Sequence, residues 1–171
     1  MIVLWILLFI IFICFGLIVF RGAPYVPSHR KDIQRAFSDL YPLTPQDVVV
    51  DIGSGDGVVL REASQHGARA IGYELNPLLV GVSRLLSRSY DGVEIRLADF
   101  WFAALPEEAT VFYAFSVSRD IPRLVKKLQA HVNSTGRPVA FITYGSGIAG
   151  AEPSAAQGAH TLYYLTPLQV E

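Results

Sequence analysis

The stretch that most constrains the fold runs from Val48 to Val59 and reads VVVDIGSGDGVV. Its three successive valines favour a parallel strand that is buried on both faces. The glycines that follow, Gly53, Gly55 and Gly57, allow a tight turn and a close approach of the backbone to a ligand. The next residues begin a helix, whose free N–H groups point at whatever lies above the turn. The stretch therefore predicts an α/β domain with a ligand at this turn.

The spacing of the glycines narrows the class of ligand. The dinucleotide fingerprint G-x-G-x-x-G requires a glycine where this chain has Val58. The phosphate loop G-x-x-x-x-G-K-[ST] is absent as well, since no lysine follows the glycines. What remains is D-x-G-x-G-x-G, in which Asp51 stands two residues before Gly53. A carboxylate at this place suits a cationic ligand better than a pyrophosphate.

This pattern resembles motif I of the class I S-adenosylmethionine (SAM) methyltransferases; the alternative is a glycine turn that binds nothing. The resemblance implies that Asp51 lies near the methionine part of SAM. Glu74 ends the next apolar run, and an acid at this offset can accept both ribose hydroxyls. Asp99 ends the third run, and the family's acid at that place, with a following apolar residue such as Phe100, contacts the adenine. The expected cofactor-binding residues are Asp51, Gly53, Ser54, Gly55, Gly57, Glu74, Leu75, Asn76, Asp99 and Phe100.

A narrower resemblance covers the chain from its N-terminus to about Leu128. The segments PYVP (24–27), DIGSGDG (51–57) and GYELNPLLV (72–80) stand behind one N-terminal apolar run. Together they are similar to the membrane-anchored protein lysine methyltransferases, which include mitochondrial enzymes acting on the ATP synthase c-subunit and on the adenine nucleotide translocase. The resemblance implies SAM as cofactor and a lysine of a membrane protein as acceptor. The short chain resembles the small prokaryotic members of this family.

The fold expected from these patterns is a Rossmann-like class I methyltransferase sheet with helices on both faces. The expected strands lie at 48–52, 69–74, 93–98, 110–115, 137–144 and 161–165. The expected helices lie at 29–40, at 58–65, from Asn76 onward with an apolar stripe of Leu78, Leu79, Val82, Leu85 and Leu86, and at 120–131. The family's sheet has seven strands, so we expect a C-terminally trimmed version. Residues 145–158, rich in Gly, Ala and Ser, are expected to form a mobile loop.

Residues 2–20 contain no charge and no proline, and predict a transmembrane helix. As a helix these 19 residues extend about 28 Å, close to the hydrocarbon thickness of a bilayer. A secretory signal is disfavoured because no basic residue precedes the run; a buried core helix is the other alternative. The basic residues that follow the run predict a cytoplasmic catalytic domain, at the inner membrane if the protein is bacterial. The expected parts are an anchor (1–21), a linker and N-terminal helix over the SAM pocket (22–45) and the SAM-binding domain (46–171).

Composition excludes several other functions. The formal net charge is −1, so no global field attracts nucleic acid, and no nucleic-acid partner is expected. The single cysteine, Cys14, excludes an internal disulfide. The four histidines show no spacing typical of a metal site, so no metal is expected.

Methylation of lysine requires a neutral amine, although the pKa of a free lysine is about 10.4. A dry aromatic channel disfavours the ammonium form. Tyr25, Tyr113 and Phe115 are the expected catalytic residues that line this channel, and core packing is the alternative role for each. Two other functions stay open: a methyltransferase for a small or lipid-soluble acceptor, and a SAM-binding assembly factor without turnover.

Overall fold

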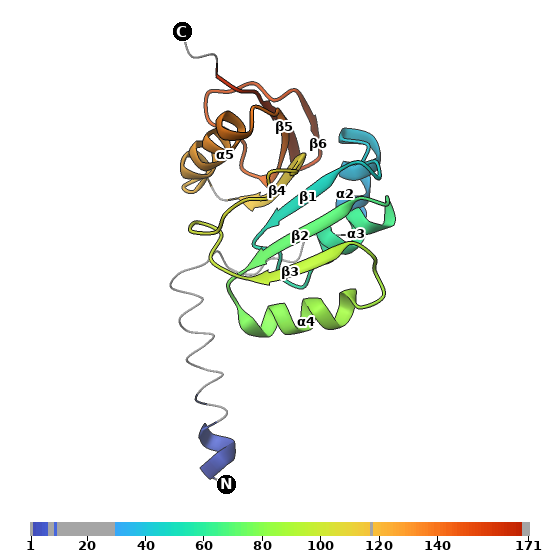
Figure 1. The fold of residues 1–171 in the computed structure, drawn as a ribbon, viewed down its shortest axis with the longest axis vertical. Helices are drawn as coiled ribbons and strands as arrows, with labels where there is room; N and C mark the ends of the chain where they lie inside the picture. Colours follow the sequence, from blue (N-terminus) through green and yellow to red (C-terminus); the bar gives the residue numbers. More distant parts are fainter. Residues whose placement is uncertain (1, 7–8, 10–29, 117, 169–171) are drawn as a thin grey trace.

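The fold is given by a computed structural model, which describes residues 2–6, 9, 30–116 and 118–168. Its centre is a mixed sheet of seven strands in the order β3-β2-β1-β4-β5-β7-β6 (Figure 1). The strands are β1 (Val48–Ile52), β2 (Arg69–Glu74), β3 (Val93–Leu97), β4 (Val111–Ser116), β5 (Val139–Gly145), β6 (Ala155–Gln157) and β7 (His160–Leu165). The first five strands are parallel, and β7 runs antiparallel to both β5 and β6.

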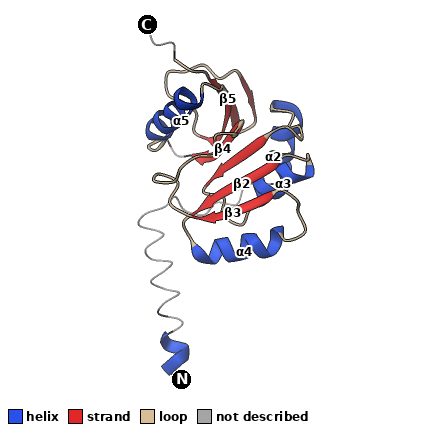
Figure 2. Cartoon of the chain, viewed as in Figure 1, coloured by secondary structure: helices blue, strands red, loops and turns tan. Residues whose placement is uncertain are grey.

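Helices cover both faces of this sheet (Figure 2). They are α2 (Arg30–Arg35), the π-helical turn η1 (Ala36–Leu40), α3 (Val58–Gln65), α4 (Pro77–Ser87) and α5 (Ile121–Thr135). One core cluster joins the sheet to α2, η1, α3 and α4, through Ile33, Phe37, Leu60 and Val80. The other joins the opposite face to α5 and to the segment that follows β3.

Local sequence accounts for the helix that covers the second face. The buried side chains of α5 are Ile121, Leu124, Leu128 and Val132, at the spacing of three and four that gives a helix one apolar side. The helix ends at Gly136, whose φ of 66° is the left-handed conformation of a glycine C-cap. The apolar residues thus determine which side of α5 packs on the sheet, and Gly136 determines where the helix ends.

The α/β, Rossmann-like sheet predicted from the sequence is confirmed, but the expected trimming is wrong. The seventh strand is β6, which lies inside the segment 145–158 that the composition predicts to be a loop. It pairs with β7 from Ala155 opposite Leu162 to Gln157 opposite His160. The two alanines and the glutamine of β6 show no alternation of apolar and polar residues that would predict a strand. The strand forms because these residues pair with the edge of β7 in a hairpin. A second difference is in the helix expected at 29–40, which becomes π-helical from Ala36 onward.

The expected membrane anchor falls largely outside the residues that the structure describes. Residues 2–6 are helical, whereas residues 7, 8 and 10–29, which include most of the span, the linker and Tyr25, lie outside the description. Among the helices of the described ranges, none has the length and apolar character needed to cross a bilayer.

Candidate cofactor and acceptor site

The glycine turn follows β1 at the carboxyl edge of the parallel strands. Gly53, Gly55 and Gly57 all have positive φ, between 54° and 81°, which other residues adopt only with strain. The backbone N–H groups of Gly53 and Ser54 both donate to the carbonyl of Tyr73 in β2, at 2.9 and 3.0 Å. The turn is therefore held against the neighbouring strand, with the start of α3 above the sheet edge.

Close packing beneath the turn explains two of its small residues. A Cβ atom on Gly57 would collide with Oγ of Ser83, so α4 approaches the turn as closely as two small residues permit. Ser54 is buried against Gly72, where a Cβ would lie 2.5 Å from Oγ of Ser54. The side chain of Ser54 therefore packs inward against β2.

Two carboxylates meet at this edge. The carboxylate of Glu74 accepts from the backbone N–H of Gly55 at 2.9 Å and from that of Asn76 at 2.7 Å, and so bridges the turn to the end of β2. Asp51 is only 3% exposed. Burial, together with the negative charges of Glu74 and Asp56, raises the pKa of Asp51 well above its usual range. A cation beside Asp51 would lower the pKa of this carboxyl and stabilise its ionised form. A cationic ligand is therefore suited to this position.

The remaining expected cofactor residues lie in three settings. Asn76 is buried and caps α4, because its side-chain oxygen accepts from the N–H of Leu78 at 2.9 Å. Leu75, beside it, is 43% exposed. Asp99 accepts from the backbone of Trp101 just beyond β3. Phe100 is buried on the α5 side, edge-to-face with Tyr73 and Trp101.

A cluster of four aromatic side chains lies on the neighbouring part of the same sheet edge. Tyr113 of β4 forms a buried hydrogen bond of 2.9 Å between its hydroxyl and Nε2 of His160, the first residue of β7. The ring centroids of His160 and of Tyr144 in β5 are 4.6 Å apart, and those of Tyr144 and Phe115 are 5.4 Å apart. The structure thus brings two of the expected channel residues, Tyr113 and Phe115, to one wall.

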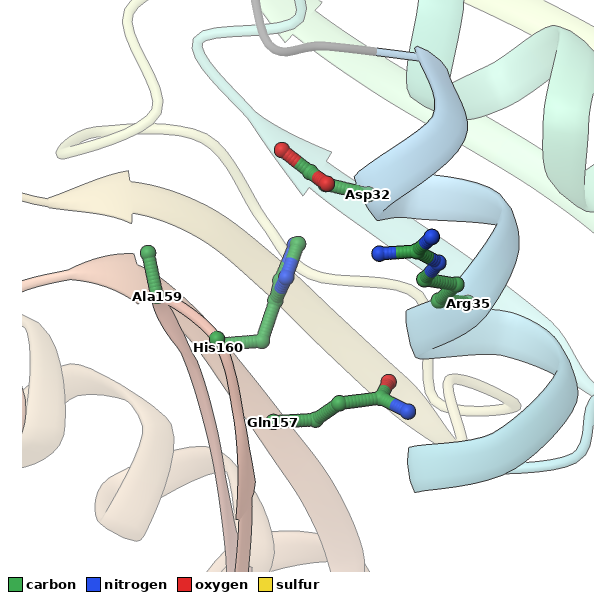
Figure 3. A pocket seen from close by; sticks show the side chains of 6 residues that line it. Asp32, Arg35, Gln157, Ala159 and His160 are labelled. Atoms are coloured by element: carbon green, nitrogen blue, oxygen red, sulfur yellow. The ribbon is translucent and has the colours of Figure 1, made fainter.

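A small cavity of about 100 Å³ opens beside this wall, between α2 and the β6–β7 hairpin. Figure 3 shows the imidazole of His160 directed from the hairpin into this space, with Asp32 and Arg35 of α2 facing it. Burial lowers the pKa of His160, and the negative charge of Asp32 opposes that shift. The lowered pKa favours the neutral form of the His160 imidazole.

Sequence reasoning missed His160, Tyr144 and Asp32. His160 stands alone in the sequence, and its partners come from two other strands and a helix. The only available indication was its position just before the strand expected at 161–165. Because β7 is antiparallel to its neighbour, its first residue lies at the carboxyl edge of the parallel strands. In the part of the chain that the structure describes, no cluster of His, Cys, Asp or Glu could hold a metal ion.

Comparison with known proteins places the chain among enzymes of one class. A search of protein-family models finds no match. The chain is 36% identical over 121 residues to the ATP synthase c-subunit lysine N-methyltransferase of Xenopus laevis, covering 68% of this chain and 52% of that protein. It is also 36% identical, over 122 residues, to the mouse adenine nucleotide translocase lysine N-methyltransferase, covering 68% and 51%.

A solved structure agrees with these relatives. An RNA methyltransferase from Salinibacter ruber, in complex with S-adenosyl-L-homocysteine, superimposes with a TM-score of 0.68 at 28% identity, over 85% of this chain and 97% of that one. The chain belongs to the class I SAM-dependent methyltransferases. In this chain the glycine turn follows β1, and Glu74 ends β2. The chain spans about half the length of the curated relatives that it matches.

Proposed function

We propose that this chain is a membrane-anchored, SAM-dependent methyltransferase that transfers a methyl group to a lysine side chain of a membrane protein. One juxtaposition carries the proposal: Asp51, the buried carboxyl before the glycine turn, pairs in the sheet with Tyr113, which belongs to the aromatic wall. The curated relatives, named as lysine N-methyltransferases of the ATP synthase c-subunit and of the adenine nucleotide translocase, support the acceptor class.

The residues at the turn fit SAM as the ligand. Asp51 offers a buried negative charge to the cationic methionine part, and the backbone of Gly53 has open space beside it. Glu74 presents a carboxylate for the ribose, and Asp99 with the exposed Leu75 borders the place expected for the adenine. When bound, SAM supplies an electrophilic methyl group on its sulfonium. The protein's own task is to orient the acceptor and to make it nucleophilic.

The aromatic wall serves that second task. A lysine side chain beside Phe115 and Tyr144 loses hydration, which disfavours its ammonium form. The hydrogen bond between His160 and Tyr113 fixes the orientation of the imidazole in this wall, and burial favours the neutral form of that ring. We propose Tyr25, on the linker, as a further wall of this channel.

The amino-acid sequence of the N-terminal region supports the proposed membrane anchor. Residues 2–20 form an uncharged apolar run of bilayer-spanning length, followed by Arg21, Arg30, Lys31 and Arg35. This arrangement holds the catalytic domain at the cytoplasmic surface and confines enzyme and acceptor to the same membrane.

A transfer assay tests the function. Membranes from cells that lack this protein are incubated with the purified full-length chain and with SAM labelled in its methyl group. Proteins, lipids and RNA are then separated and counted. We expect the label in a discrete protein band, and its loss with Gly55→Arg, because a large side chain on the turn excludes SAM. Label only in the lipid extract or in RNA would contradict a protein acceptor. Binding of SAM without any transfer would favour an assembly factor.

A further inference from the structure

Helix α4 presents its apolar side to the outside of the protein. Four side chains of its leucine and valine stripe are 45 to 61% exposed: Leu78, Val82, Leu85 and Leu86. The side chains that α4 buries are instead Val80, Ser83 and Ser87. A helix on the surface of a soluble domain ordinarily turns its apolar stripe inward and its serines outward. The reversed arrangement indicates that something covers the stripe.

Three contacts fix this orientation, so α4 cannot rotate its leucines inward. Ser83 faces Gly57, and only side chains as small as these allow the observed approach. Asn76 caps the first turn through its bond to the N–H of Leu78. Arg84 donates from its guanidinium to the carbonyl of Ile95 at 2.8 Å, which fixes the last turn against β3. The exposure of the stripe is thus a property of the packed fold.

The charge of the helix restricts what covers it. Residues 76–90 contain Arg84 and Arg88 and no acidic residue. An apolar face flanked only by cationic side chains is typical of helices that lie in the interface of a bilayer containing anionic lipids. Figure 1 shows α4 along the outer edge of the domain, beside β3 and on the side remote from α5, so that a flat surface can approach it.

The length of the preceding chain places a bilayer within reach. Nine residues, 21–29, separate the end of the apolar run from the first residue of α2. Even fully extended they span only about 30 Å, at roughly 3.3–3.6 Å per residue. The domain therefore stays within about one domain diameter of the membrane in which the run is embedded.

We propose that α4 lies flat on the cytoplasmic surface of the bilayer, with Leu78, Val82 and Leu85 inserted between lipid headgroups. The proposal rests on the membrane anchoring proposed above and extends it. Because α4 begins three residues after Glu74, docking would hold the mouth of the cofactor crevice at the level of the headgroups. An acceptor lysine would then be one that its own protein presents at the membrane surface.

A fluorescence experiment with the full-length chain tests this surface. In a Cys14→Ala background, Leu85→Cys is labelled with an environment-sensitive fluorophore, and Lys126→Cys, on the exposed side of α5, is the matched control. The proteins are reconstituted into vesicles of phosphatidylcholine and phosphatidylglycerol, with or without lipids carrying a nitroxide quencher. We expect a blue-shifted emission at position 85 and several-fold stronger quenching there than at 126. Leu78→Cys should behave like Leu85→Cys.

Three other results would overturn the proposal, and they are distinguishable. A chain that floats with the vesicles while both probes remain unquenched would refute α4 docking and leave the anchor intact. A blue shift at position 85 without quenching by lipid would mean that protein covers the stripe, either residues 2–20 or another chain. A chain that fails to float would refute the anchor and the docking together.

Discussion

Replacement of Asp51 by asparagine should stabilise the free protein while it weakens SAM binding. The carboxyl group is buried beside Glu74 and Asp56, and burial is the largest cause of its raised pKa. When the pKa of a carboxyl is higher in the folded than in the unfolded state, its stabilising contribution is fully present below the unfolded pKa. That contribution is lost as the pH rises through the folded pKa. At pH 7, above the pKa of an unfolded aspartate, this carboxyl therefore lowers the stability of the fold, and asparagine, which has nearly the same shape and does not titrate, removes the effect.

The size of both effects follows from the burial of Asp51. Relieving a buried polar group that lacks compensation is worth about 1–3 kcal/mol, and each kcal/mol raises the Tm of a domain of this size by roughly 2–4 °C. Loss of a charged partner for the cationic ligand costs about 1.5–3 kcal/mol of binding, or roughly a 10–150-fold higher Kd for SAM. The amide keeps the volume, so packing should not change.

Differential scanning fluorimetry of the free protein and calorimetric titration with SAM measure the two effects separately. Asp91→Asn, at an exposed turn, is the matched control and should change neither quantity. A lower Tm for Asp51→Asn with unchanged SAM affinity would refute the reasoning, since it would show Asp51 to be a structural residue remote from the ligand.

Three further predictions concern the neighbouring elements. Ser83→Leu should destabilise the fold by about 1–3 kcal/mol in urea titrations, because the larger side chain collides with Gly57; unchanged stability would show that α4 can move away. His160 has a pKa lowered by burial, so its unfavourable protonation should reduce stability as the pH falls below about 6.5 toward the folded pKa. The His160→Gln variant should lose that part of the pH dependence, and identical slopes would contradict it. Val82→Glu with Leu85→Glu should leave Tm and SAM affinity unchanged but reduce methyl transfer to membrane proteins several-fold; full transfer would count against α4 docking.

The place of the glycine turn and of its neighbouring acids in the sheet was predictable because its determinants are local in sequence. The glycine spacing after β1 and the acids at the ends of β2 and β3 each belong to one short segment, and parallel strands bring such segments to one edge. The sequence alone therefore predicts that Asp51, Glu74 and Asp99 lie at or just beyond the carboxyl ends of neighbouring strands.

Of the aromatic wall, Tyr113 and Phe115 could be predicted, but the contribution of His160 and the orientation of α4 could not. The bond between Tyr113 and His160 joins residues 47 positions apart, and it depends on β7 being antiparallel to β5. The period of the leucines correctly predicted a helix, but periodicity does not say which side faces the sheet. That choice is made by the close approach of Ser83 to Gly57, which only the packed structure contains.

Mass spectrometry of membrane proteins can show directly whether this chain methylates a lysine of a membrane protein. Peptides are compared from cells with the intact chain, from cells without it, and from cells with Gly55→Arg at matched expression. We expect at least one membrane-protein lysine that is methylated on its ε-nitrogen only when the intact chain is present, at a position near the membrane surface. Identical lysine methylation in all three samples, with purified protein that binds SAM normally, would contradict it.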